Sequence, residues 1–79
     1  MMGAIELDWV DDKRTDKEII ALAGKYHLIG QCVGHVNDWP TYRFFGEEKN
    51  LKKFMKREYD PDSVRDFDCY VTSWDGGDD

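Results

Sequence analysis

The sequence predicts an α+β domain whose elements follow one another in the order β-α-β-β-α-β. Three observations support this prediction. Four segments alternate apolar and polar residues, which is the two-residue period of a strand with one buried face. Two other segments repeat their apolar residues at the spacing of an α-helix. The chain has 79 residues, a length that fits one domain and leaves no room for a second.

The first predicted strand and the first predicted helix follow from local pattern. Residues 4–10 place their apolar side chains on one side and their acidic side chains on the other. Thr15 then begins a helix, because its hydroxyl can accept from an amide of the first turn while Glu18 reaches back to the Thr15 amide. Apolar residues recur at helical spacing as far as Tyr26, and Gly24 weakens the last turn.

A hairpin comes next. Residues 27–37 alternate as a second strand, and residues 41–46 as a short third one. Between them, Asn and Asp favour a turn, and Pro40 has no N–H to give to a strand ladder.

The second predicted helix covers residues 47–59, with a stabilising pair between Glu48 and Lys52. It carries a basic stripe made of Lys49, Lys52, Lys53, Lys56 and Arg57. Such a stripe is typical of a solvated helix face, although it can also follow phosphates. Residues 60–62, Asp-Pro-Asp, end the helix, and residues 64–74 form the fourth predicted strand.

These elements favour a ferredoxin-like βαββαβ arrangement. Each helix has one apolar stripe, so both helices cover the same face of a four-stranded antiparallel sheet. Right-handed crossovers place the strands in the order 4-1-3-2. We expect residues 1–74 to form the domain and residues 75–79 to form a flexible acidic tail.

This arrangement leaves the second face of the sheet open. Alternation places Phe45, Tyr70 and Trp74 on it, with Ile29 and Val33 toward its far edge. Large rings on an open sheet are a candidate surface for binding a partner. Two alternatives stay open: the rings only shield the sheet, or the tail or a second copy of the chain covers them.

The charged residues provide a check on which side chains of each strand face outward. Arg43 on the third strand would lie beside Glu6 and Asp8 on the first, so that opposite charges meet on the open face. The same face would carry Gln31, His35 and Thr72. The opposite face would bury Ile5, Leu7, Trp9, Leu28, Cys32, Val36, Tyr42, Phe44, Phe67, Cys69 and Val71.

A second candidate surface lies at one end of the sheet. Strand directions predict that loops there gather six aspartates, namely Asp11, Asp12, Asp38, Asp60, Asp62 and Asp66. This acidic end could bind a basic protein surface or a cation, but Asp is also common in ordinary turns. The spacing matches no calcium loop, so we predict no metal site.

Composition excludes several function classes. The formal net charge of −6 repels phosphate backbones and anionic membranes and favours basic protein partners. No apolar run approaches the ~20 residues of a membrane span, and the first residues lack the pattern of a signal peptide. Cys32 and Cys69 are far apart and form no CxxC motif, which indicates a reducing compartment. We therefore expect a cytoplasmic protein.

Motifs for catalysis and cofactors are missing from the sequence. His27 and His35 have no partner at zinc spacing, and no glycine-rich phosphate loop is present. Ser63 and Ser73 lie in no nucleophile elbow. These observations predict a protein that is not an enzyme and needs no cofactor.

The function favoured by the sequence is protein binding. Small size and acidic charge suit an inhibitor of the kind encoded by phages and mobile elements, which occludes a basic or nucleic-acid-binding surface of a host protein. One alternative is single-stranded nucleic-acid binding on the open face, which Glu6 and Asp8 disfavour. Another is a ligand-binding oligomer, including a homodimer through that face.

Overall fold

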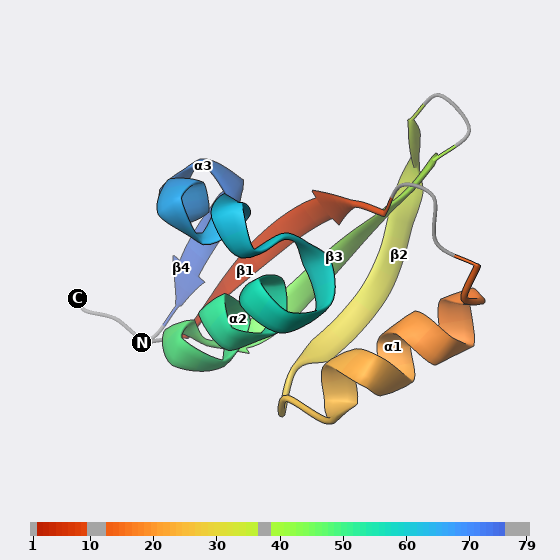
Figure 1. Ribbon diagram of the computed structural model, residues 1–79, viewed down its shortest axis with the longest axis horizontal. Helices are drawn as coiled ribbons and strands as arrows, with labels where there is room; N and C mark the ends of the chain where they lie inside the picture. Colours follow the sequence, from red (N-terminus) through yellow and green to blue (C-terminus); the bar gives the residue numbers. More distant parts are fainter. Residues whose placement is uncertain (1, 10–12, 37–38, 76–79) are drawn as a thin grey trace.

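The computed structural model describes residues 2–9, 13–36 and 39–75 (Figure 1). Within these ranges the chain has four strands, β1 (Met2–Asp8), β2 (Ile29–Val36), β3 (Trp39–Glu47) and β4 (Val71–Asp75). It has three α-helices, α1 (Asp16–Gly24), α2 (Glu48–Phe54) and α3 (Phe67–Tyr70), with a π-helical turn η1 (Met55–Tyr59) and a 3-10 helix η2 (Pro61–Asp66) between the last two. The strands form one antiparallel sheet in the order β2-β3-β1-β4, as predicted.

The connection from β3 to β4 differs from the prediction, so the chain does not have the standard ferredoxin-like arrangement. We expected one helix and then a strand over residues 64–74, but η2 and α3 occupy most of that segment. Asp60 accepts a hydrogen bond of 3.0 Å from the Asp62 amide, and Pro61 is the first residue of η2. An Asp followed by Pro is therefore a helix start here, and the sequence pattern could equally be read as a stop.

Both ends of α1 have well-defined caps. The predicted capping box is confirmed, with distances of 3.3 Å from the Glu18 amide to the Thr15 hydroxyl and 2.8 Å from the Thr15 amide to the Glu18 carboxylate. At the other end, the Leu28 amide donates to the Ala23 carbonyl and the His27 amide to the Gly24 carbonyl. This pair of bonds is a Schellman motif, and it places His27 in the left-handed region at φ 61°.

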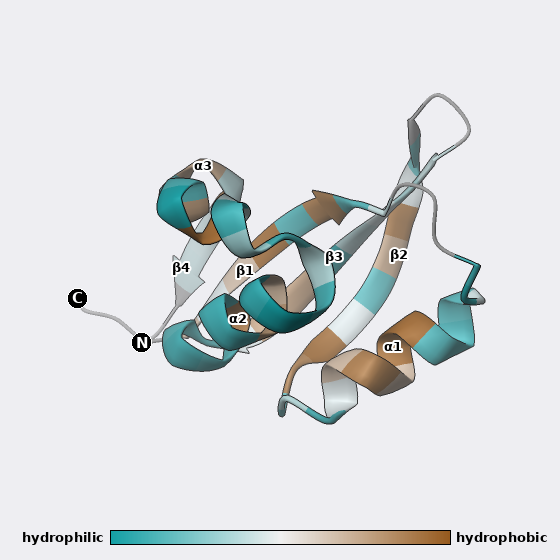
Figure 2. Cartoon of the chain, in the orientation of Figure 1, coloured by the Kyte–Doolittle hydropathy of each residue, from teal (hydrophilic) through white to brown (hydrophobic). Residues whose placement is uncertain are grey.

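The described helices all lie on one face of the sheet (Figure 1), where their apolar side chains meet those of the strands. In Figure 2 the ribbon of β2 changes between hydrophobic and hydrophilic colours along its length, and Ile29, an apolar residue of this strand, is exposed. The core consists of Ile5, Leu7, Trp9, Ile19, Ala23, Leu28, Tyr42, Phe44, Leu51, Phe54, Met55 and Phe67. Trp9 lies among its rings, with centroids 5.8 Å from Phe54 and 5.4 Å from Tyr59.

Most of the predicted inward residues are confirmed. Seven of them belong to this core, while Cys32 and Val71 pack against it half-buried. Cys69 was placed wrongly: it is exposed, because it belongs to α3 and not to a strand. The side chain of Val36 lies outside the part that the structure describes.

Three further predictions concern the surface and the end of the chain. Gln31 is exposed and pairs with Arg43 on the open side, as predicted. His35 and Thr72 are also exposed, but His35 pairs with Pro40, which shares the side of Tyr42, and Thr72 lies at the register shift of β4. Asp75, predicted as the first residue of the tail, is the last residue of β4, and residues 76–79 lie outside the described ranges. No helix in the described ranges is both long enough and apolar enough to span a bilayer.

Candidate functional site

The uncovered side of the sheet, here called the open face, has no described helix above it. Its residues alternate with the buried ones of the same strands and follow from the register. They include Met2, Ala4, Glu6 and Asp8 of β1, Ile29, Gln31 and Gly34 of β2, Trp39, Thr41, Arg43, Phe45 and Glu47 of β3, and Ser73 of β4.

The middle of the open face is polar and internally paired. The Arg43 guanidinium lies 2.5 Å (Nη2) and 3.1 Å (Nε) from one oxygen of Glu6, which confirms the predicted meeting of opposite charges. Asp8 does not share this contact, since its carboxylate accepts a 2.7 Å hydrogen bond from the Thr41 hydroxyl. The carboxylates of Glu6 and Asp8 on the open face are therefore both hydrogen-bonded to side chains of β3.

The apolar part of the open face lies on the β2–β3 hairpin. Phe45 is half-buried, and its cross-strand neighbours are Ala4 on β1 and Ile29 on β2. Ile29 is 70% exposed, the highest value among the large hydrophobic residues that the structure describes as exposed. Val33, at the irregularity of the β2–β3 pairing, is 39% exposed, and Trp39 is 41% exposed. We call Ile29, Val33, Trp39 and Phe45 the hairpin stripe.

Trp74 does not belong to the open face, contrary to the prediction. It pairs with Gly3, which shares the covered side of β1 with Ile5, and its ring lies 6.1 Å from buried Phe67 between centroids. The reason is a register shift in the β1–β4 pairing between Ala4 and Ile5, which reverses the alternation along β4.

Tyr70 was also placed wrongly. It lies in α3 and not in a strand, and it packs half-buried against the core with its ring 6.4 Å from that of Tyr59. Of the three aromatic residues that we predicted on the open face, only Phe45 is there.

The predicted acidic end stays largely a prediction. Asp11, Asp12 and Asp38 lie outside the described residues. Asp62 and Asp66 both lie in η2, within the β3–β4 connection. Over residues 2–9, 13–36 and 39–75, no group of three or more His, Cys, Asp or Glu residues is arranged to hold a metal ion.

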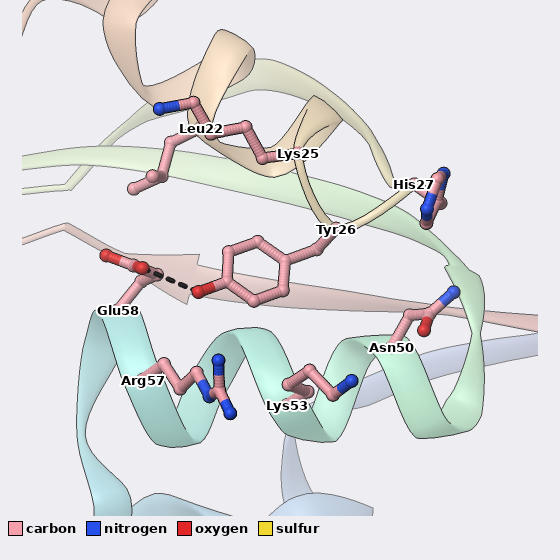
Figure 3. Close-up of a pocket in the computed structure, with 8 residues that line it drawn as sticks. All are labelled: Leu22, Lys25, Tyr26, His27, Asn50, Lys53, Arg57 and Glu58. Atoms are coloured by element: carbon pink, nitrogen blue, oxygen red, sulfur yellow. Dashed lines mark hydrogen bonds between the residues drawn. The ribbon is translucent and has the colours of Figure 1, made fainter.

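A cleft of about 420 Å³ separates the C-terminal end of α1 from α2 and η1 (Figure 3). We call it the basic cleft, and its lining consists of Leu22, Lys25, Tyr26, His27, Asn50, Lys53, Arg57 and Glu58. The Tyr26 hydroxyl donates a 2.6 Å hydrogen bond across it to Glu58 (Figure 3). That bond raises the pKa of Tyr26, burial and the Glu58 charge add to the rise, and Arg57 acts in the opposite direction.

Comparison of the chain with protein-family models, curated proteins and solved structures finds no match. The function therefore has to be inferred from the two surfaces themselves.

Sequence reasoning located most of the hairpin stripe but missed the basic cleft. It placed Phe45, Ile29 and Val33 on the open face and left Trp39 in the predicted turn before Pro40. Lys53 and Arg57 were assigned to a solvated stripe, and nothing linked them to Lys25. One signal was available: Asn50, Lys53 and Arg57 are spaced three and four residues apart, which puts them on one helix face.

Proposed function

We propose that the protein is a non-enzymatic protein-binding module that docks through the hairpin stripe onto a partner with a basic surface. The observation that carries this proposal is the position of Ile29. Its side chain is 70% exposed, directly opposite Phe45, on a side of the sheet that no described helix covers. Ile29 and Phe45 form an apolar pair whose neighbours on this face, Gln31 and Arg43, are polar, and an apolar group with a polar border is typical of protein interfaces.

The stripe has the composition of an interface core. Phe45 and Trp39 are aromatic, and aromatic residues are common among the residues that contribute most to binding. Covering the Ile29 side chain would contribute roughly 1–2 kcal/mol through removal of apolar area from water. The stripe follows two hydrogen-bonded strands, so little backbone order has to be gained on binding.

Charge favours a basic partner. The chain has a formal net charge of −6, and the open face carries the Asp8 carboxylate beside the ion pair of Glu6 and Arg43. Opposite charge on the partner would speed the encounter and set the orientation. The net negative charge of the chain and the Asp8 carboxylate on this face disfavour single-stranded nucleic acid, because its phosphates would be repelled.

A basic protein surface commonly serves to bind nucleic acid. An acidic module that covers such a surface would act by occlusion, as inhibitors encoded by phages and mobile elements do. This is the mode of action that we propose, with the stripe providing affinity and the acidic charge providing selectivity for the partner.

Two matched substitutions test the proposal. Ile29→Ser removes the most exposed residue of the stripe, whereas Ile20→Ser makes the same change at a 38% exposed position on α1. The tagged protein captures partners from lysate of its source cells, and the affinity of each purified partner is then measured for both variants over a salt series. We expect Ile29→Ser to weaken binding about 5–10-fold, Ile20→Ser to stay within about twofold, and salt to weaken binding.

Three results would contradict the proposal. The first is an equal loss of partner affinity in Ile29→Ser and Ile20→Ser. The second is a partner affinity that Ile29→Ser leaves unchanged. The third is a chain that pairs only with itself, seen in sedimentation velocity as a concentration-dependent dimer that Ile29→Ser abolishes, because the occupant of the stripe would then be a second copy.

A further inference from the structure

We propose that the basic cleft binds a phosphorylated small molecule of about nucleotide size. The cleft lies on the helical side of the domain, away from the open face, so this inference is independent of the proposed docking. It rests on the placement of charge, on the way the surrounding backbone is capped, and on the size of the cleft.

Two segments that are far apart in the sequence form the walls. Lys25, Tyr26 and His27 come from the end of α1 and the turn after it. Asn50 and Lys53 come from α2, and Arg57 and Glu58 come from η1. Figure 3 shows these side chains on the two sides of the gap, with Tyr26 reaching across it toward Glu58.

Positive charge predominates in the cleft although the whole chain is acidic. Lys25, Lys53 and Arg57 contribute three cations, and none of them forms a salt bridge with another described residue. The Glu58 carboxylate is the one acidic group in the lining, and it accepts a hydrogen bond from Tyr26. An anion between the walls would relieve the repulsion among these cations, and a phosphate can accept several hydrogen bonds from Arg and Lys at once.

The backbone of α1 does not oppose an anion as strongly as an open helix end would. The last carbonyls of a helix carry partial negative charge, which repels anions. Here the carbonyls of Ala23 and Gly24 already accept bonds from the Leu28 and His27 amides, at 3.1 Å and 3.0 Å. The Schellman turn thus satisfies these groups and sets His27 at the edge of the cleft.

The π-helical turn gives the cleft a second unusual backbone feature. Arg57 and Glu58 are adjacent in sequence and both line the cleft, although consecutive residues of an α-helix point about 100° apart. π-helical turns are rare and occur frequently at functional sites.

Size decides between ligand classes. A volume of about 420 Å³ falls in the range of small-molecule pockets and exceeds what a lone phosphate ion needs. Leu22 and the Tyr26 ring offer apolar surface, and the Asn50 amide can both donate and accept hydrogen bonds. A nucleic-acid strand is disfavoured, because its phosphates would continue beyond the cleft over an acidic protein.

Calorimetric titration of the full chain tests this proposal, with ADP, pyrophosphate, adenosine and a mixed single-stranded oligonucleotide as probes. The double variant Lys53→Gln/Arg57→Gln removes two cations of the cleft. Its control, Lys56→Gln/Arg65→Gln, removes the same residue types from exposed positions outside the lining. We expect submillimolar binding of ADP, weaker binding of pyrophosphate and no binding of adenosine. We also expect the affinity for ADP to fall about tenfold in the cleft variant and less than about twofold in the control.

Several outcomes would overturn the inference: no binding of ADP or pyrophosphate at millimolar concentration, equal loss in both double variants, or tighter binding of the oligonucleotide than of ADP. Thermal melting checks that each variant is folded. If the cleft variant unfolds, Lys25→Gln against Lys17→Gln repeats the comparison with two lysines of α1 and its C-cap, of which only Lys25 lines the cleft.

Discussion

The indole of Trp74 lies over Gly3, with Cε3 2.7 Å from the position that a Cβ on residue 3 would occupy. The two residues are cross-strand partners on the covered side of the β1–β4 pair. Because a Cβ would also approach the Ser73 carbonyl to 3.2 Å, glycine at position 3 is what allows β4 to lie against β1 with a tryptophan at this point.

We expect Gly3→Ala to destabilise the fold by about 1–2 kcal/mol, because the ring has to move and the short β4 is disturbed. Gly24→Ala is the matched control. Nothing lies within 4 Å of its Cβ position in α1, so the same change should stabilise by about 0.5–1 kcal/mol. Urea unfolding of both variants measures the difference. Equal effects would show that Trp74 does not constrain residue 3.

The left-handed conformation of His27 leads to a second prediction. At φ 61°, glycine avoids the clash that a Cβ suffers, so His27→Gly should stabilise the fold by about 0.5–1 kcal/mol relative to His27→Ala. Thermal or urea unfolding of the two variants checks this. If alanine proves at least as stable as glycine, the Schellman turn is not formed as described.

A third prediction concerns alkaline pH. The hydrogen bond to Glu58 raises the pKa of Tyr26 above its usual 10.0, and burial raises that of Tyr59. The folded chain therefore binds the hydroxyl protons of Tyr26 and Tyr59 more tightly than the unfolded chain does. Their stabilising contribution is complete below about pH 10 and is lost as pH rises through the raised values.

The urea midpoint of the wild type should therefore fall as the pH rises above about 10, and it should fall less steeply in Tyr26→Phe. Absorbance of tyrosinate gives an independent readout, in which Glu58→Ala should lower the pKa of Tyr26. Identical slopes in wild type and Tyr26→Phe, together with no change in the tyrosinate titration, would contradict the Tyr26–Glu58 bond.

Much of the sheet could be predicted because alternation is a local property. Ile5 and Phe44 are buried partners, as the pattern of each strand alone requires. The side of Trp74 could not be predicted, since one register shift in β1–β4 reverses the alternation without leaving a mark in the sequence. The start of η2 at Pro61 could not be predicted either, because an Asp-Pro pair can end one helix or begin the next.

The two candidate surfaces differ in this respect. The open face could be predicted, because one apolar stripe on each helix places both helices on the same side of the sheet. The basic cleft joins Lys25 to Lys53 and Arg57 across nearly thirty residues of chain, a distance over which spacing rules say nothing. By contrast, the contact between Arg43 and Glu6 was predictable, because opposite charges on neighbouring strands follow from the strand order.

The central claim is that a partner covers the hairpin stripe, and the isoleucine methyl groups test it most directly. The chain has four isoleucines, of which Ile5 and Ile19 are buried, Ile20 is exposed on α1 and Ile29 is exposed on the open face. In a methyl NMR spectrum recorded on adding the captured partner, we expect the Ile29 signal to shift or broaden and the Ile20 signal to stay in place. A spectrum in which Ile20 responds and Ile29 does not would place the partner on the helices and contradict docking through the open face.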